Sequence, residues 1–334
     1  MTSTPPVPSE DRAATPRRSS SLTGNSRRGD SLFFGASAGS GILLLVIMAA
    51  IAGFLVWRSV IAINADQSNF FTTFEWDPDN ILKPSFGIAV LVFGTIVSAL
   101  IAMVIAVPVA VGIALFISHY APRKIAQPFA YLVDLLAAVP SIVYGLWGAL
   151  FLVPHMAGLT SWLNDYLGWT YIFKVSHPGA PARNLFVVGI LLAIMVLPII
   201  TAVSREVFRQ VPRMHEEAAL ALGATRWEMI RTAVLPFGRP GIISASMLGL
   251  GRALGETIAV ATVLSASNVL SLHILDAGGG TFAQNIALKF AEAGGPGKDA
   301  LMASGLVLFV ITLLVNGAAR IIIARRKEYS GANS

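Results

Sequence analysis

Long apolar stretches alternate with shorter polar segments along most of the chain. A helix that crosses a membrane needs about 20 predominantly apolar residues. Six stretches meet this requirement, at residues 38–62, 87–117, 129–153, 185–204, 241–265 and 301–323. The pattern therefore predicts an all-α polytopic membrane protein with about six transmembrane helices. Pro108 and Pro140 lie inside the second and third stretches and predict kinks there.

Composition agrees with a membrane protein and excludes several kinds of chemistry. Of the 334 residues, 55% are hydrophobic and 13% charged, whereas a soluble domain has about 25% charged residues. The absence of cysteine excludes disulfides, thiolate metal sites and a cysteine nucleophile. Histidines are scattered without ligand spacing and no catalytic motif is present, so neither a metal site nor a catalytic residue is expected.

The distribution of basic residues predicts the orientation of the spans. Seventeen of the 24 Lys and Arg residues fall in segments that are cytoplasmic if the N-terminus is inside, and five fall in the outside loops. This positive-inside bias predicts that both termini are cytoplasmic. Because the basic residues flank apolar stretches rather than forming one stripe, nucleic acid is not an expected partner.

The same reading divides the chain into three parts. Residues 1–34 are polar without periodicity and predict a disordered cytoplasmic tail. Residues 35–325 form the transmembrane domain, which includes a cytoplasmic loop at 205–240. Residues 326–334 form a cytoplasmic C-terminal tail.

One predicted cytoplasmic segment has the pattern of a folded projection. Residues 212–240, PRMHEEAALALGATRWEMIRTAVLPFGRP, favour helix except at Gly223. Thr225 and Glu228 have the spacing of a capping box that starts a second helix, and Pro236 is expected to end it. The pattern predicts a helix, a sharp turn and a helix, although a simple polar connection is the alternative.

This segment resembles the EAA loop of ABC-importer permeases. The resemblance lies in Glu217-Ala218-Ala219, in Gly223 after three further residues, and in the closing Leu235-Pro236; Ala233 stands where the family has Ile. It implies a coupling helix that docks on a separate ATPase subunit. The chain contains no phosphate-binding loop of the G-x-x-x-x-G-K-[ST] type. We therefore expect a transport subunit with no cofactor of its own, and ATP and magnesium bound by the partner ATPase.

Two opposite charges interrupt the fifth apolar stretch. In GLGRALGETIAV, residues 249–260, Arg252 is expected near the centre of a span with Glu256 as its i+4 partner. Ionisable residues at such depth usually face the protein interior and mark a substrate path; mutual neutralisation is the alternative. Gly251 and Gly255 form a small-xxx-small step that allows another helix to approach.

The chemistry of this pair suggests an oxyanion substrate. A guanidinium matches the geometry of oxyanions, phosphate in particular. A nearby carboxylate can accept a hydrogen bond from hydrogen phosphate but repels sulfate, which carries no proton. Our hypothesis is that Arg252 attracts phosphate and Glu256 selects against sulfate. One guanidinium supplies one positive charge to a dianion, so we expect a partner to add another basic residue.

Together with VPSIVYGLWGALFLVP at residues 139–154, these motifs resemble the PstC-type permeases of bacterial phosphate ABC importers. The resemblance implies the type I ABC-importer permease fold, a location in the bacterial cell membrane, and import of inorganic phosphate driven by ATP. It implies three kinds of partner: a second homologous permease, two copies of a cytoplasmic ATPase, and an extracytoplasmic phosphate-binding protein.

The resemblance also assigns roles to residues. Arg252 and Glu256 are implied to bind substrate, and Pro140, Ser141 and Tyr144 are candidates to line the path. A Tyr144 hydroxyl bonded to a backbone carbonyl is an alternative, and Asp134 can pair with a loop arginine. Two other functions remain open, an ion-coupled secondary anion transporter and a membrane-embedded phosphate sensor; we see no inverted repeat that favours the first.

Overall fold

The computed structural model describes residues 26–66, 68–80, 83–177 and 179–327. The chain comprises two compact units, residues 1–51 and 52–334. The described part of the first unit is the beginning of helix α1 (Ser26–Ala65). Residues 26–34, which were predicted to belong to the N-terminal tail, are therefore part of α1. Residues 1–25 of the predicted tail lie outside the described part. Of the predicted C-terminal tail, residues 328–334 also lie outside it, because helix α12 (Gly295–Lys327) continues to Lys327.

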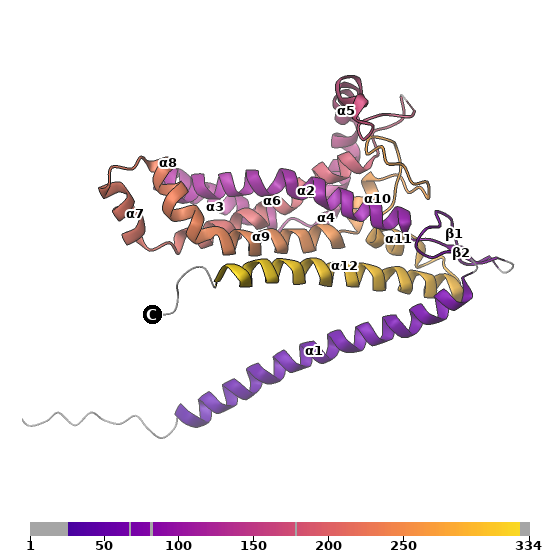
Figure 1. Cartoon of the computed structure of the whole chain (residues 1–334), viewed down its shortest axis with the longest axis horizontal. Coiled ribbons are helices and arrows are strands. Elements are labelled where there is room, and N and C mark those ends of the chain that lie inside the picture. Colours follow the sequence, from indigo (N-terminus) through magenta and orange to yellow (C-terminus); the bar gives the residue numbers. More distant parts are fainter. Residues whose placement is uncertain (1–25, 67, 81–82, 178, 328–334) are drawn as a thin grey trace, which may run out of the picture. The chain divides into compact units, whose positions relative to one another are not determined.

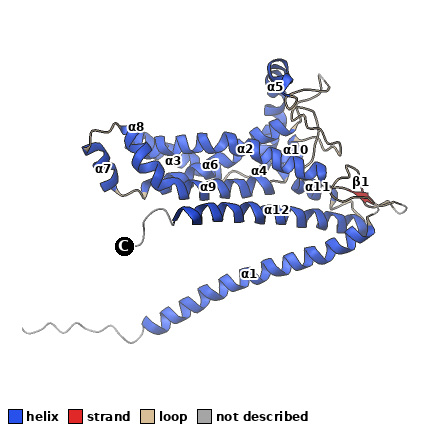
Figure 2. Cartoon of the chain, viewed as in Figure 1, coloured by secondary structure: helices blue, strands red, loops and turns tan. Residues whose placement is uncertain are grey.

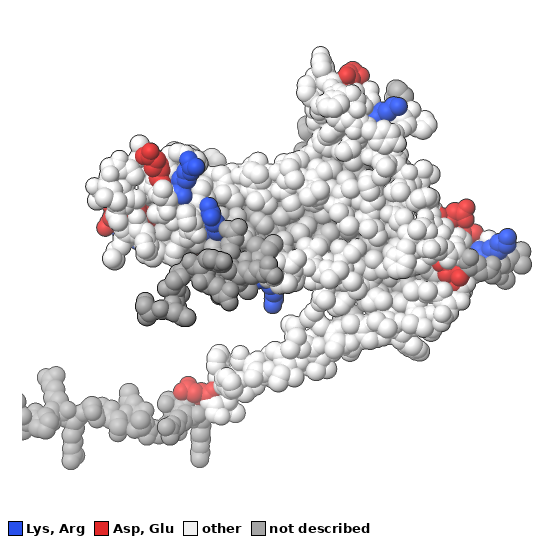
Figure 3. Space-filling model, viewed as in Figure 1, with Lys and Arg blue, Asp and Glu red and all other residues white. Residues whose placement is uncertain are grey.

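Helices make up most of the described chain (Figure 2). Among the described residues, six helical stretches are long and apolar enough to cross a membrane, which confirms the prediction of an all-α protein with six spans. These are Gly29–Ala65, Ala89–Tyr120, Ser141–Thr170, Leu185–Arg209, Arg226–Gly255 and Gly295–Ile321. On the face of the second unit drawn in Figure 3, charged side chains gather at the ends and the surface between them is mostly uncharged, as expected for a surface in contact with lipid.

Helix α6 (Leu185–Arg209) is the central element of the second unit, and α2 (Ala89–Leu115) and α9 (Leu235–Gly255) pack against it (Figure 1). The α2 face is a stripe of fully buried alanines at helical spacing, Ala102, Ala106 and Ala110. Small side chains let two backbones approach closely, which is the main source of helix association in lipid. At Gly189 of α6, a Cβ atom would lie only 2.5 Å from the Ile101 side chain of α2.

The third span differs from the prediction of 129–153. Helix α3 (Arg123–Ala137) ends before Pro140, and a new helix α4 (Ser141–Trp147) begins after it. Proline has no N–H to donate to the helical hydrogen bonds, and it disfavours helical backbone at the preceding residue. The helix therefore ends at this point, where a kink was predicted. A π-helical segment, Gly148–Leu152, then joins α4 to α5 (Val153–Leu167). In contrast, α2 continues through Pro108 and into a π segment, Phe116–Tyr120.

The fifth span also differs from its predicted limits, 241–265. It begins at α8 (Arg226–Met229), passes through a π segment (Ile230–Val234) and continues as α9 to Gly255. Pro236 was expected to end a helix, but it lies just after the π segment, and the helical backbone continues through it into α9. After α9 the backbone is extended at Glu256, and a short helix α10 (Ile258–Val263) follows.

The segments at the opposite end from α8 include little regular structure. Strands β1 (Trp76–Asp77) and β2 (Ser85–Phe86) form one antiparallel pair. Helix α11 (Phe282–Lys289) precedes α12, and its first turn is closed by a capping box between Thr281 and Gln284. Arg58 of α1 pairs with Asp299 of α12 at 2.6 Å between Nε and Oδ1.

Candidate functional site

The end of α9 is the centre of the candidate site. Glu256 follows the last helical residue with an extended backbone (φ −70°, ψ 127°). Its side chain is 8% exposed, and Oε1 accepts the N–H of Ala259 at 3.2 Å. A buried carboxylate is costly unless its oxygens have donors. This hydrogen bond therefore stabilises both Glu256 and the first turn of α10.

Arg252 does not form the expected pair with Glu256. It lies in the last turn of α9 and not at the middle of a span. No ion pair joins the two side chains in the part of the chain that the structure describes. Residues at i and i+4 become neighbours only within one continuous helix, and α9 ends between these two. The partly exposed guanidinium is thus left available to another group.

Helix α4 brings the third-span residues beside this break. Gly145 of α4 packs on α10, where an added Cβ would lie 2.9 Å from the Ala259 Cα atom. The neighbouring Tyr144 is buried, and its hydroxyl lies close enough to Arg252 to interact with it electrostatically. The two segments that carry the sequence motifs therefore meet at one site.

The hydroxyl of Tyr144 donates a hydrogen bond to the carbonyl of Leu136 at 2.9 Å. Leu136 lies in the last turn of α3, and its carbonyl also accepts the N–H of Val139 at 3.3 Å. Tyr144 thus ties α3 to α4 across the break at Pro140, in agreement with the alternative considered for it. Pro140 and Ser141 lie at the start of α4. Asp134 of α3 pairs with Arg205, at the end of α6 and not in a loop, at 3.3 Å.

The glycines of α9 divide between two faces. Gly249 is buried against α6, where a Cβ would lie 2.7 Å from the Ile200 side chain. Gly251 and Gly255 are exposed, and beyond their own stretch of helix no described atom lies within 4 Å of a Cβ added to either. The small-xxx-small step next to Arg252 is therefore open in this chain.

The loop at 205–240 folds as predicted into a helix, a turn and a helix. Helix α7 (Arg213–Ala221) carries Glu217, Ala218 and Ala219. Gly223 follows with φ +86°, a conformation that favours glycine. The predicted capping box is confirmed, because Thr225 Oγ1 accepts the Glu228 N–H at 3.3 Å and Glu228 Oε2 accepts the Thr225 N–H at 2.8 Å.

This projection is anchored on one side and open on the other. Met229, Ile230 and Val234 are buried with Phe208 of α6, and Nε2 of His119 lies 3.4 Å from Oε1 of Glu216. The turn and its flanks leave large apolar side chains exposed, namely Met214, Leu222 and Trp227. A rigid support with exposed apolar groups is typical of a protein-binding surface.

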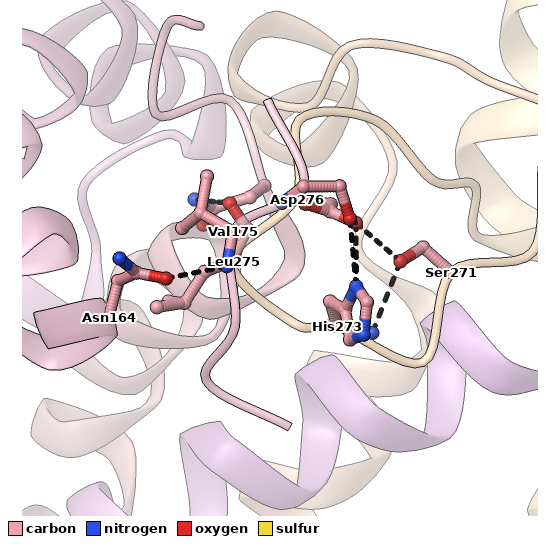
Figure 4. A network of polar contacts seen from close by, with 8 residues as sticks. Asn164, Val175, Ser271, His273, Leu275 and Asp276 are labelled. Carbon is pink, nitrogen blue, oxygen red and sulfur yellow. Dashed lines mark hydrogen bonds and ion pairs between the residues drawn. The ribbon is translucent and has the colours of Figure 1, made fainter. Parts of the chain in front are cut away.

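The opposite end holds a polar network that the sequence did not reveal (Figure 4). Asp276 Oδ2 accepts from Ser271 Oγ at 2.6 Å and lies 3.1 Å from Nδ1 of His273. The other carboxylate oxygen accepts the Ser176 N–H at 2.7 Å. Burial opposes the charge of Asp276, but these hydrogen bonds outweigh it and lower its pKa. The network joins two segments about a hundred residues apart, so spacing in the sequence gave no signal for it.

No group of three or more His, Asp or Glu side chains that could hold a metal ion occurs among the described residues. The polar groups near the break are a guanidinium, a carboxylate and hydroxyls. Such groups can bind and orient an oxyanion by hydrogen bonds and charge.

Comparisons with known proteins agree with a transport function. The family described as "Binding-protein-dependent transport system inner membrane component" matches residues 106–328. The "Phosphate transport system permease protein PstC 2" of Mycobacterium tuberculosis is 47% identical over 298 residues, which are 89% of this chain and 92% of that protein. The "Phosphate transport system permease protein PstC" of Mycobacterium leprae is 45% identical over 303 residues, 90% of this chain and 95% of that protein. A solved chain of a bacterial ABC transporter for alginate import is 16% identical with a TM-score of 0.48, and covers 88% of this chain and 98% of its own length.

Proposed function

Because the chain belongs to the family of binding-protein-dependent transport system inner membrane components, we propose that it is the permease subunit of an ATP-driven importer of inorganic phosphate. The observation that carries this proposal is the long similarity to phosphate permeases, 47% identity over 89% of the chain. The chemistry at the end of α9 agrees with it. A guanidinium and a buried carboxylate lie beside a helix break, where charged groups in membrane proteins usually serve transport.

The break separates the roles of Arg252 and Glu256. Arg252 has no acidic partner in the described chain, so its charge is available to attract phosphate. Oε1 of Glu256 is engaged by Ala259, and the carboxylate retains further lone pairs. These can accept the proton of hydrogen phosphate, whereas sulfate offers no proton and is repelled. Pro140, Ser141 and Tyr144, at the start of α4, are the residues we propose to line the same path.

A second, homologous permease completes the path in this proposal. Gly251 and Gly255 leave the α9 face beside Arg252 open. Small residues on a membrane helix allow close approach of another helix. A partner helix at this face would screen the charged site from lipid and enclose the substrate between two subunits.

ATP hydrolysis is assigned to a separate subunit, present in two copies, which binds ATP and magnesium. The chain has no phosphate-binding loop. Its projection at α7 and α8 exposes Met214, Leu222 and Trp227 beside the EAA residues. We propose that this surface docks on the ATPase on the cytoplasmic side of the bacterial cell membrane, together with both chain termini. An extracytoplasmic phosphate-binding protein would deliver phosphate at the opposite end.

The test is ATP-dependent uptake of radioactive phosphate into proteoliposomes that contain the whole complex and its binding protein. Arg252→Gln is compared with wild type and with Arg239→Gln, which removes an exposed arginine from the same helix. We expect Arg252→Gln to abolish uptake while the four subunits still copurify, and Arg239→Gln to retain it. Uptake by wild type that needs an ion gradient and not ATP would instead support a secondary transporter. ATP hydrolysis without any phosphate uptake would contradict the proposal.

A further inference from the structure

A groove between α9 and α12 contains a second arginine. Its lining includes Ser244, Gly251 and Arg252 of α9 with Asn316 and Arg320 of α12. The two arginines lie 68 positions apart in the sequence, and one lies in each helix. None of the described side chains that line the groove is acidic.

The packing of α9 and α12 places both arginines on one groove, and helix geometry predicts that their side chains lean toward its middle. Helices α9 and α12 contact one another and run in opposite directions (Figure 1). A helical side chain leans toward the N-terminus of its own helix. Arg252 therefore leans toward the level of Ser244, and Arg320 leans toward the level of Asn316. In antiparallel neighbours these two directions converge on the groove that both residues line.

Two positive charges in one groove are unfavourable without an anion. Neither guanidinium has an ion-pair partner in the described part of the chain. Their repulsion is stronger beside apolar helices than in water, because the local dielectric is lower. A doubly charged oxyanion neutralises both and can accept forked hydrogen bonds from each.

The other polar groups of the groove suit the same ligand. Asn316 is exposed and can donate from its amide. Ser244 already donates to the Pro240 carbonyl at 3.0 Å, so its oxygen is left to accept a proton. Two cations, an amide donor and a hydroxyl acceptor are complementary to a hydrogen phosphate group.

We propose that the groove lined by Arg252, Arg320, Asn316 and Ser244 binds a phosphate group, and that Arg320 supplies the second positive charge. The inference deepens the proposed function and depends on it. The phosphate group comes from the transported ion or from the headgroup of an anionic phospholipid. In the first case the chain itself provides two cations for its dianionic substrate.

Because the chain has no cysteine, a single introduced thiol reports on the groove. Asn316→Cys is made in the whole complex in nanodiscs of phosphatidylcholine, and the rate at which a thiol reagent labels this chain is measured with increasing inorganic phosphate. Leu313→Cys, exposed on the same helix but outside the groove, is the control. Chloride at equal ionic strength controls for screening. We expect phosphate to slow labelling at position 316 and not at position 313.

In the Asn316→Cys protein, the further change Arg320→Gln should raise the phosphate concentration that halves the labelling rate. The expected increase is roughly tenfold or more, which is the effect of losing a hydrogen bond from a charged group. If phosphatidylglycerol in the nanodisc protects position 316 and free phosphate does not, the groove binds a lipid headgroup. Protection by neither, or protection unchanged by Arg320→Gln, overturns the proposal. ATP-driven phosphate uptake by the wild-type complex is measured in parallel, so that failure of the groove and failure of the transport function are told apart.

Discussion

Arg252 and Glu256 lie on the two sides of the point where α9 ends, and no ion pair joins them among the described residues. Glu256 is held by the Ala259 N–H on the α10 side, while Arg252 faces a groove on the α9 side. Two charges whose i, i+4 spacing in the sequence suggests mutual neutralisation are therefore separate groups in the structure.

Glu256→Gln should weaken selection against sulfate. The amide oxygen of Gln can still accept the Ala259 N–H, so α10 should form, but the negative charge that repels sulfate is lost. The measurement is ATP-dependent uptake of radioactive phosphate and sulfate at millimolar concentrations without the binding protein, so that the permease alone selects. Unchanged discrimination contradicts the assigned role. Glu256→Ala, which also removes the acceptor, should destabilise the protein by about 0.5–2 kcal/mol.

Gly223→Val should separate ATP hydrolysis from transport. The backbone at this position has φ +86°, where a β-branched side chain is strained by at least about 1–2 kcal/mol. The turn should change shape and move α7 relative to α8, so phosphate uptake per ATP hydrolysed should fall. Both rates are measured in the same proteoliposomes. Gly223→Asn is the matched control, because Asn tolerates this conformation, and equal losses in the two variants would argue against the turn as the cause.

Gly145→Val should weaken the contact between α4 and α10. The added Cβ would lie 2.9 Å from the Ala259 Cα, and such overpacking typically costs about 1–3 kcal/mol. A lower unfolding temperature of the detergent-solubilised protein is the expected result. Gly158→Ala in α5, where the described chain leaves open space around the new Cβ, should not lower that temperature, because Ala favours helix more than Gly does.

Lys289 should react with amine reagents near neutral pH. Burial lowers its pKa to about 8, and its ammonium lies 5.0 Å from the centre of the Trp76 ring. At pH 8 about half of the Lys289 amines are then neutral and nucleophilic. Labelling of each lysine by a membrane-impermeant acylating reagent, followed by peptide mass spectrometry, gives the pH profile. A labelling midpoint of Lys289 well above pH 8 contradicts the expectation.

The sign of the linked stability change follows from the same pKa. The unfolded chain binds more protons at Lys289 between about pH 8 and the ordinary lysine pKa, so stability should rise with pH across this window. Lys289→Met should remove that rise. Labelling by the impermeant reagent from outside whole cells also tests the proposed orientation, because Lys289 lies at the end opposite to α7.

Asp276→Asn should loosen the two joined segments at that end. The carboxylate accepts from Ser271 and from the Ser176 N–H, and an amide has fewer acceptor sites for these donors. The folded pKa is lowered, so the stabilisation is present above the pKa of the unfolded chain and is lost as pH falls through the folded pKa. Limited proteolysis between residues 171 and 184 should be faster in the variant at neutral pH. Wild type should approach the same rate only in acid.

Two features of the fold could be predicted from short stretches of sequence, because each depends only on residues close together in the chain. Six apolar stretches predict six spans since the length of a spanning helix is set by the thickness of the membrane. Gly223 and the Thr225–Glu228 capping box predict a turn and a helix start since each depends on a few neighbouring residues. At Pro140 only a kink was predicted and at Glu256 no break was expected, because neither break ends the long apolar stretch in which it lies.

By itself, the sequence determined the class of protein, the approximate spans, the folded projection at 205–240 and the presence of Arg252 and Glu256 in an apolar stretch. These follow from composition, periodicity and short spacings, which act along the chain. Tertiary structure alone decided that Arg252 and Arg320 line one groove, that Gly145 packs α4 on α10, and that Ser176 binds Asp276. Each of these joins residues distant in sequence, and their contact depends on how whole helices pack.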